Sequence, residues 1–321
     1  MMITKISKYL RDFIFDKYMR FQYLNKIGAY RFLSDTKWVK KWYYLKTGNE
    51  IDLENPKTFH EKMQWYKINY HDPAMPLLAD KNAVRQYVES KGLQKLLKEQ
   101  YGVYDRFGDI DFQKMPDVFY LKTNHGSGAN EIIRKKDTRQ IAKAQRFFDA
   151  QLRKNYYWKY REWAYKDITP KLICEEYLGG TGDDPLVDLN LFCFYGKVRM
   201  IYYNVNLADQ EGKHSDGKRA VFDENMNYIK GAKTQMEVLP EEECIVPSDM
   251  EEIIRYAECL AADFPHVRVD FFYISQKVYF GEMTFYSAGG DMHLEPPELL
   301  EKLNQYFDID KIREQTNLRN D

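Results

Sequence analysis

The stretch FPHVRVDFFYISQKVYFGEMTFY, residues 264–286, decides the fold. It reads as two β-strands rich in Val, Phe and Tyr, joined by a turn at Ser275–Gln276. Alternate side chains of a strand share one face of a sheet. A hairpin over this stretch therefore brings Asp270 of the first strand and Glu282 of the second onto one face, opposite each other.

Arg268 and Thr284 share that face with the two carboxylates. Two carboxylates on neighbouring strands repel each other unless a cation lies between them. Mg²⁺ prefers hard oxygen ligands and is often bound by one or two carboxylates together with nucleotide phosphates. The pattern therefore has two interpretations: a magnesium site, or a cross-strand cluster on a solvated face that Arg268 neutralises.

A second chemical signature is VFYLKTNHGSGANEIIRKK, residues 118–136. Its β-rich runs flank a dense glycine cluster, which predicts a strand, a glycine loop and a returning strand. Lys122 ends the first strand, and Gly126 and Gly128 allow backbone amides to approach phosphate oxygens without Cβ obstruction. The GxxxxGK[ST] pattern of a Walker loop is absent. A phosphate loop and an ordinary hairpin with a buried lysine both fit this stretch.

Helical and strand patterns alternate along the rest of the chain, without repeats or low-complexity linkers. Thr58 and Glu61 form the capping-box pattern at the start of a helix, and residues 80–92 and 250–264 also read as helical. Another hairpin turns at Tyr195–Gly196. The mixture predicts the α/β or α+β class.

The composition excludes several kinds of protein. Lys and Arg total 48 and Asp and Glu 49, so the net charge of −1 provides no field to hold nucleic acid. The four cysteines show no CxxC spacing, and the sequence has neither a signal peptide nor a membrane span, so we expect a cytoplasmic protein. GxSxG and dinucleotide-binding patterns are absent, which argues against hydrolases and dehydrogenases.

Residues 3–30 predict a basic amphipathic helix or helix pair. Apolar side chains recur there at near-helical spacing between Lys and Arg residues. Such a helix contacts the anionic inner leaflet of a membrane or packs on its own domain. The sequence leaves both interpretations open.

The order of these groups along the chain resembles the ATP-grasp superfamily of carboxylate–amine ligases. It runs from Asp80–Lys81 through Lys122 and its glycine loop to residues 175–178, 268–270 and 282–284. The flanking words NPKTFHEKMQWYK, LADKNAVRQYV, REWAYKDITPKLICEEYL and LFCFYGK resemble the TupA-like branch, named for teichuronopeptide biosynthesis and found among capsule and exopolysaccharide genes.

The resemblance implies an ATP-grasp fold of the α/β (α+β) class, in which two α+β lobes clamp ATP and Mg²⁺ behind an N-terminal helical segment. The implied boundaries are 1–50 for the basic helical segment, 51–110 for the substrate-side lobe, 111–178 for the small lobe with phosphate loop and adenine hinge, 179–295 for the C-terminal lobe with the metal and catalytic hairpin, and 296–321 for a C-terminal helix.

The resemblance also implies roles for individual residues. The implied ATP-binding residues are Lys81, Lys122, His125, Gly126, Ser127, Gly128, Glu175, Glu176, Tyr177, Leu178 and, for the ribose, Asp183. The implied metal ligands are Asp270, Glu282 and Thr284, and the implied catalytic residues are Arg268 and Lys122.

Substrate contacts are expected at two further places. The basic-aromatic cluster Arg161, Trp163 and Lys166 fits an anionic sugar, or alternatively a helix end packed with aromatic side chains. Ser287 and Gly289 stand in a segment that replaces the family's more usual Pro-Gly turn, and we expect them to shape the acceptor pocket.

The sequence departs from the family pattern in two positions near the metal strand. Thr284 stands where many members have Asn as a metal ligand. Asn190 stands where related sequences often have a Lys, and Lys197 or Arg199 is a candidate replacement.

These features predict a ligase that uses ATP to activate a carboxylate of a sugar acid or amino acid, free or part of a glycan, for attack by an amine in cell-surface polysaccharide synthesis. The alternative is a glycosyltransferase that binds a nucleotide-sugar through a metal at the acid pairs Asp109–Asp111 or Asp308–Asp310.

Overall fold

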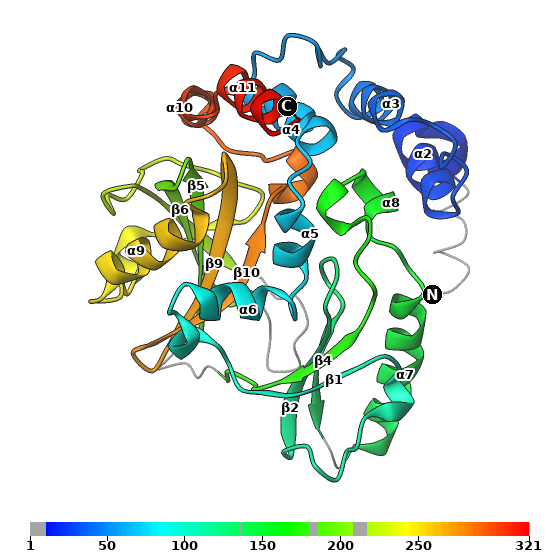
Figure 1. The fold of residues 1–321 in the computed structure, drawn as a ribbon, viewed down its shortest axis with the longest axis vertical. Helices are drawn as coiled ribbons and strands as arrows, with labels where there is room; N and C mark the ends of the chain where they lie inside the picture. The colour runs from blue at the N-terminus through cyan, green and yellow to red at the C-terminus, as the bar shows by residue number, and fades with distance from the viewer. Residues whose placement is uncertain (1–10, 135–136, 180–184, 208–216, 321) are drawn as a thin grey trace.

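The computed structural model describes residues 11–134, 137–179, 185–207 and 217–320, with the side chains of 315–320 excepted, and is a mixed α+β protein with two β-sheets (Figure 1). The strand order is β1-β4-β2-β3 in the small sheet and β10-β9-β5-β6-β7-β8 in the large sheet. Within the described ranges, neighbouring strands pair antiparallel except β7 with β8. The expected α+β class is confirmed.

The small sheet has its own hydrophobic core beneath one long helix. Phe119 and Leu121 of the sheet pack there with Phe148 of the helix, and all three side chains are fully buried. The elements are β1 (Gln100–Tyr104), η2 (Phe107–Asp109), β2 (Val118–Thr123), β3 (Asn130–Arg134), α7 (Thr138–Leu152) and β4 (Leu172–Glu175).

The large sheet is apolar on one face and polar on the other. Leu189 and Leu191 pair with Phe271 and Val269 in register, and all four side chains are fully buried. α9 packs against this sheet at β5, β6 and β9. The elements are β5 (Val187–Phe194), β6 (Lys197–Val205), β7 (Lys218–Asp223), β8 (Glu237–Val238), η4 (Glu241–Glu243), α9 (Met250–Ala261), β9 (His266–Ile274) and β10 (Lys277–Thr284).

In Figure 1, α4, α10 and α11 lie above the large sheet, α5 and α6 lie between the two sheets, and α2 and α3 lie at the upper right near α8. Residues 11–15 are also helical. The elements are α2 (Lys17–Lys26), α3 (Asp35–Thr47), α4 (Phe59–Asn69), α5 (Ala74–Ala79), α6 (Val84–Ser90), η1 (Gln94–Leu96), α8 (Tyr157–Tyr160), η3 (Trp163–Tyr165), η5 (Ser287–Gly290), α10 (Pro297–Tyr306) and α11 (Ile309–Asn320).

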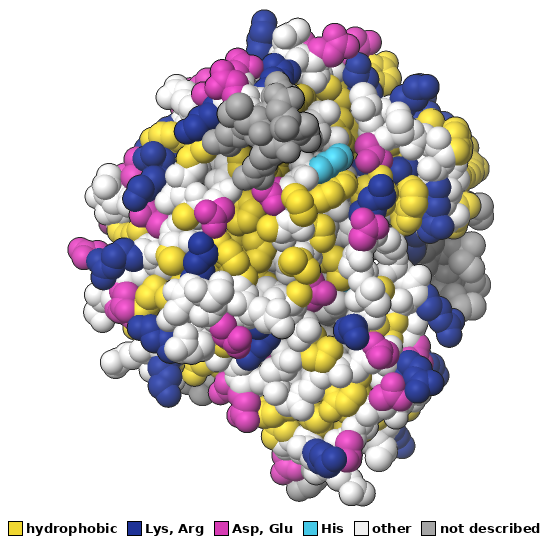
Figure 2. Space-filling view, in the orientation of Figure 1, with side chains coloured by type: hydrophobic (Ala, Val, Ile, Leu, Met, Phe, Trp, Pro, Cys, Tyr) yellow, Lys and Arg dark blue, Asp and Glu magenta, His cyan; other side chains and the backbone are white. Residues whose placement is uncertain are grey.

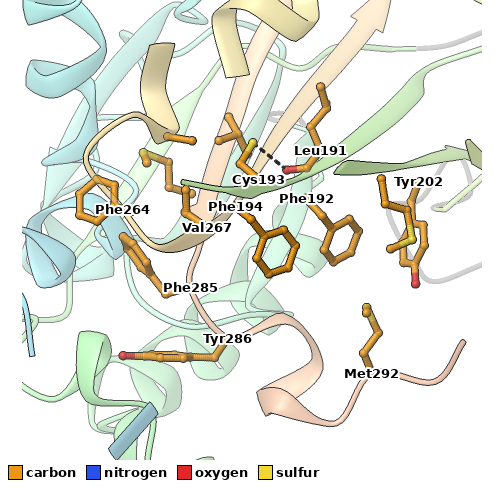
Figure 3. Packing of buried hydrophobic residues seen from close by; sticks show 14 of the residues in the cluster. Leu191, Phe192, Cys193, Phe194, Tyr202, Phe264, Val267, Phe285, Tyr286 and Met292 are labelled. Carbon is orange, nitrogen blue, oxygen red and sulfur yellow. Dashed lines mark hydrogen bonds between the residues drawn. The ribbon is translucent and has the colours of Figure 1, made fainter. Parts of the chain in front are cut away.

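Surface charge and the aromatic core both follow from the composition. Basic and acidic side chains are interspersed over the face shown in Figure 2. Phe192, Phe194, Phe285 and Tyr286 pack in the large core shown in Figure 3. Cys193 is buried in the same core and donates a hydrogen bond to the carbonyl of Leu191 at 3.6 Å.

Several predicted turns and caps are confirmed. Ser275 and Gln276 have φ angles of 50° and 57°, which suit a two-residue hairpin turn between twisted strands. Tyr195 and Gly196 also have positive φ, and the capping box of Thr58 and Glu61 has both of its hydrogen bonds.

Two predicted helices differ from the structure. The C-terminal segment forms two helices because Phe307, fully buried against the aromatic core, interrupts it. The basic N-terminal segment turns after α2 and returns as α3, and Phe21, at the centre of α2, is 1% exposed. In α2, the packed-helix interpretation is therefore the correct one for the Phe21 face.

Candidate functional site

The polar face of the large sheet collects the hairpin residues that the sequence singled out. Glu282 pairs with Asp270 in register, and Asn190 of β5 pairs with Asp270 on its other side. A β-bulge between Phe280 and Glu282 sets this register. Gly281 lies within the bulge, where a Cβ atom would lie 3.0 Å from the carbonyl oxygen of Asp270, so a larger residue would push the two strands apart.

Arg268 links the acidic side chains of this face. Its Nε and Nη2 donate to the two oxygens of Asp270 at 2.7 and 2.5 Å, and Nη2 lies 3.6 Å from Oε1 of Glu282. Thr284 donates its hydroxyl hydrogen to Glu282 at 3.0 Å. The carboxylates are thus close together and neutralised by arginine, although Asp270 is buried and the face there is not a solvated one. The magnesium interpretation stays a prediction.

Asp188, which the sequence analysis missed, is a third acidic side chain beside this pair. It lies on β5 two residues before Asn190 and receives a hydrogen bond from its amide at 2.5 Å. Burial, followed by the negative charges of Asp270 and Glu282, raises the pKa of Asp188. A carboxyl group in such surroundings favours its neutral form until a cation arrives.

The donor set fits a magnesium ion that also binds phosphate. Asp270 and Glu282 offer carboxylate oxygens from adjacent strands, and Thr284 offers a hydroxyl. Among the residues that the structure describes, no group of three or more His, Cys, Asp or Glu side chains has metal-binding geometry. Mg²⁺ in nucleotide sites needs only one or two carboxylates, because phosphates and water complete its octahedral shell.

Lys81 connects this acidic face to the glycine loop. Its ammonium lies 3.1 Å from Oε2 of Glu282 and donates a hydrogen bond to the carbonyl of Gly126 at 2.6 Å. Burial acts to raise the pKa of Glu282, but the positive charges of Lys81 and Arg268 outweigh it and lower the pKa, so the carboxylate stays charged. The contact joins residues that are 45 and 201 positions away from Lys81 in sequence.

The glycine loop turns back over the end of β2. Gly126 has a φ of 73°, and a Cβ atom there would lie 2.3 Å from the ring of Tyr156, so both its conformation and its packing require glycine. His125 is buried, and its Nε2 lies 3.0 Å from the carbonyl oxygen of Lys154. Ser127 and Gly128 are exposed at the tip of the loop.

Two lysines share one buried carboxylate at the base of this loop. Lys122 and Lys98 lie 2.8 and 2.6 Å from Oε1 of Glu175, which is 3% exposed. Burial raises the pKa of Glu175, but the two lysines outweigh it and bring the pKa to about 2. Lys98 is a second residue that the sequence analysis missed.

The expected adenine hinge begins at Glu175. The side chain of Glu175 pairs with the two lysines. The backbone amide of Glu176 donates a hydrogen bond to the carbonyl of Glu99 at 2.9 Å. Tyr177 and Leu178 continue beyond β4 as partly exposed extended chain. Asp183, expected at the ribose, lies outside the described residues.

The acid-unfolding profile is expected to reveal the Glu175 ion pair. The pKa of this group is about 2 in the folded protein and 4.5 ordinarily, so its stabilising effect is complete above pH 4.5 and lost as the pH falls toward 2. The loss in the free energy of unfolding is about 3 kcal/mol. Urea unfolding of wild type and Glu175→Gln from pH 7 to pH 2.5 measures it.

In Glu175→Gln that share of the pH dependence should vanish, and the variant should lose about 3 kcal/mol or more at pH 7, because two buried lysines lack a counter-charge. Glu258→Gln is the matched control: Glu258 pairs with Lys197 at 2.7 Å but at the surface, where the expected loss is at most about 1 kcal/mol. Identical pH profiles for wild type and Glu175→Gln would contradict the buried ion pair.

The residues expected at the substrate fall into two groups. Arg161 is 2% exposed, pairs with Asp35 at 3.2 Å and donates to the carbonyl of Tyr30 at 2.7 Å. These contacts favour the packed-aromatic interpretation for Arg161. Trp163 stacks on a histidine ring, and Lys166 is exposed beside it.

The η5 segment is anchored to α4 and lies against Tyr160 and Glu162, the neighbours of Arg161. The carbonyl of Gly289 accepts hydrogen bonds from Gln64 at 3.1 Å and from Lys67 at 3.0 Å. The hydroxyl of Ser287 is buried and has no hydrogen-bond partner among the described residues. A buried hydroxyl without a partner is uncommon. The expected role of Ser287 at the acceptor stays a prediction.

Arg219 is a basic side chain that the structure places near Asn190, to which it is linked through Asn204. Lys197 pairs with Glu258, and Arg199 stacks on the ring of Tyr306, so neither candidate replacement is free. Arg219 of β7 donates to Asn204 at 2.5 Å. In register, Asn204 of β6 pairs with both Arg219 and Asp188, which places Arg219 on the polar face. No carboxylate of the described residues forms an ion pair with Arg219. Burial lowers the pKa of its guanidinium.

Comparisons with known proteins identify the family of this chain. A family model described as TupA-like ATPgrasp matches residues 61–308. A search of curated proteins found no match.

The solved structures to which this chain is similar include three ligases. An L-amino acid ligase from Bacillus licheniformis is 14% identical with a TM-score of 0.40 over 66% of this chain, and the chain spans 43% of its length. A D-alanine–D-alanine ligase from Bacillus anthracis complexed with ATP is 15% identical, TM-score 0.43, covering 79% and 70% of the two chains. VanG D-Ala:D-Ser ligase from Enterococcus faecalis is 14% identical, TM-score 0.41, covering 78% and 62%.

Proposed function

The chain belongs to the TupA-like ATP-grasp family, and we propose that it is an ADP-forming carboxylate–amine ligase. The acid is a sugar acid or an amino acid, free or within a glycan, and the amide formed becomes part of a capsular, exopolysaccharide or teichuronopeptide product. The reaction takes place in the cytoplasm.

The observation that carries this proposal is the position of Lys81 between Glu282 and the carbonyl of Gly126. It supports a nucleotide site in which the phosphate-binding lysine joins the glycine loop of the small sheet to the metal carboxylates of the large sheet. We assign the small lobe to residues 111–178 and the metal-binding lobe to residues 179–295, so that ATP is held between them. Residues 51–110 form the substrate-side lobe.

The reaction has two steps whose atoms balance. A carboxylate oxygen of the substrate attacks the γ-phosphorus of ATP, and the bond to the β-phosphate oxygen breaks, which releases ADP and leaves an acyl phosphate. The amine then attacks the acyl carbon, the carbon–oxygen bond to phosphate breaks, and the nitrogen loses a proton as the amide forms. Mg²⁺ held by Asp270, Glu282 and Thr284 would neutralise phosphate charge.

The protein side chains position and neutralise these groups. Lys81 and Lys122 hold the phosphates of ATP, and His125 to Gly128 form the loop over them. Arg268 faces the oxygens that gain negative charge during phosphoryl transfer and amine attack, which is the main task of a protein in such chemistry. Arg219 adds a second guanidinium on the same face for an anionic group of the substrate.

A nucleotide screen tests this proposal. At about one hundred times its dissociation constant, ATP·Mg²⁺ should raise the free energy of unfolding by about 2.7 kcal/mol, which appears as a higher Tm. ADP release is then measured over pairs of acids and amines. Sugar nucleotides without a carboxylate should have no such effect.

A rise in Tm with these sugar nucleotides but not with ATP·Mg²⁺ would favour the glycosyltransferase alternative. The acid pairs of that alternative have other contacts: Asp109 pairs with Arg106, and Asp111 pairs with Lys114, both at the surface.

A further inference from the structure

The surface around α2 has an unusual number of exposed apolar side chains. Phe15, Ile27 and Phe32 are 80%, 78% and 81% exposed, and Phe13 and Ile14 are exposed as well. Five of the ten exposed large hydrophobic side chains in the described residues therefore lie within residues 13–32. Such a concentration marks an interaction surface rather than scattered surface residues.

These side chains border the same helix. Arg20 of α2 donates hydrogen bonds to the carbonyls of Phe13 at 3.4 Å and Ile14 at 3.2 Å, which hold residues 11–15 against the start of α2. Tyr30 stacks on Phe21 with ring centroids 4.7 Å apart, so the turn after α2 folds back alongside it. The exposed apolar residues therefore lie at the two ends of α2, which is ten residues long.

This part of the chain is also strongly basic. Residues 1–49 contain eleven Lys and Arg against three Asp and no Glu, although the whole chain has 48 basic and 49 acidic side chains. Lys17 and Lys26 are exposed, and neither has an ion-pair partner among the described residues. Asp35 is already paired with Arg161. The rest of the protein is correspondingly acidic.

We propose that this apolar and basic surface docks the protein on an anionic membrane. Phe15, Ile27 and Phe32 would enter the interface between headgroups and acyl chains, and Lys17 and Lys26 would contact lipid phosphates. The contacting side chains flank α2, and the Phe21 face that the sequence suggested packs inward. No helix of the described chain has the length and apolarity needed to cross a bilayer.

The charge pattern selects a membrane over a second copy of the chain. A symmetric dimer through this surface would bring the lysines of one protomer against those of its partner, and like charges repel. An anionic lipid surface attracts the same lysines while it accepts the apolar side chains. The proposal rests on this surface alone and is independent of the ligase reaction.

Vesicle flotation of the full chain tests the docking surface. Vesicles of phosphatidylcholine with about a third phosphatidylglycerol should recover the protein, vesicles of phosphatidylcholine alone should recover little, and 0.5 M salt should reduce recovery. Lys17→Gln/Lys26→Gln should weaken partition about fivefold per lysine, which corresponds to about 1 kcal/mol each. Phe15→Ser/Ile27→Ser/Phe32→Ser should abolish recovery.

The matched controls are Leu77→Ser/Ile245→Ser for exposed apolar side chains and Lys143→Gln/Lys230→Gln for exposed lysines, both distant in sequence from α2. These should float like wild type. Equal recovery with neutral and anionic vesicles, or equal losses in the controls, would overturn the proposal. So would a dimer in sedimentation equilibrium that Phe15→Ser/Ile27→Ser/Phe32→Ser dissociates, since the surface would then be a self-interface.

Discussion

Replacing Glu282 by alanine is expected to lower ATP-dependent turnover by at least about a thousandfold while the protein stays folded. The carboxylate has three partners at the site, Lys81 at 3.1 Å, Thr284 at 3.0 Å and Arg268 at 3.6 Å. Its loss removes one of the two proposed acidic metal ligands and leaves Lys81 without its counter-charge. Electrostatic groups at a reacting phosphate are worth several kcal/mol each. ADP release in the presence of acid and amine measures the effect.

The matched control for this variant is Glu252→Ala. Glu252 of α9 also pairs with a lysine, Lys95 of η1, at 3.1 Å, but both side chains lie at the surface. Its turnover should stay within about twofold of wild type, and the Tm of both variants should show that they fold. Turnover by Glu282→Ala close to that of wild type would remove the hairpin from the active site.

Arg268→Lys is expected to lower kcat by about a hundredfold or more and to leave the dissociation constant of ATP within about threefold. The guanidinium presents Nε and Nη2 as a fork to Asp270, and the same Nη2 also reaches Thr284 at 3.3 Å. Lysine keeps the positive charge but cannot contact two oxygens in one plane. If Arg268 meets the charge that develops in the transition state, the loss falls on the chemical step.

Arg199→Lys controls for the general effect of removing a guanidinium. Arg199 stacks on Tyr306 of α10, away from the acidic face, and its replacement should leave kcat unchanged. Isothermal titration with ATP·Mg²⁺ gives the dissociation constant, and single-turnover kinetics give the rate. A loss confined to ATP affinity, with kcat intact, would make Arg268 a partner that only neutralises Asp270.

Local pattern was enough to predict the two strands of the acidic hairpin and its turn, but not the pairing of its carboxylates. The two-residue turn pairs Ile274 with Lys277 and Phe271 with Phe280, and this register would continue with Asp270 opposite Gly281. The β-bulge shifts the register, so that Asp270 and Glu282 lie opposite each other as expected, and Ser275–Gln276 form the turn. The bulge at Gly281 could not be predicted, since it depends on the close approach of the Asp270 carbonyl from the neighbouring strand.

The residues that the sequence analysis missed all act across large separations. Lys98 contacts Glu175 although the two residues are 77 positions apart, and no sequence pattern around either residue predicts this contact. Arg219 and Asp188 join the hairpin face only because β5 and β9 are neighbours in the sheet and β6 and β7 extend it. Their side chains become one cluster through strand order, which local spacing does not encode.

The sequence by itself determined the α+β class, the strands and turn of the acidic hairpin and the glycine loop, because each depends on periodicity or on residues a few positions apart. Membership of the ATP-grasp family followed from the order of the motifs. Tertiary structure alone decided that Lys81 joins Glu282 to the glycine loop, that Arg161 is buried and paired with Asp35, and that Phe21 points inward. Those outcomes depend on which distant surfaces pack together, since burial and pairing at one residue are set by partners that its own neighbourhood in sequence does not contain.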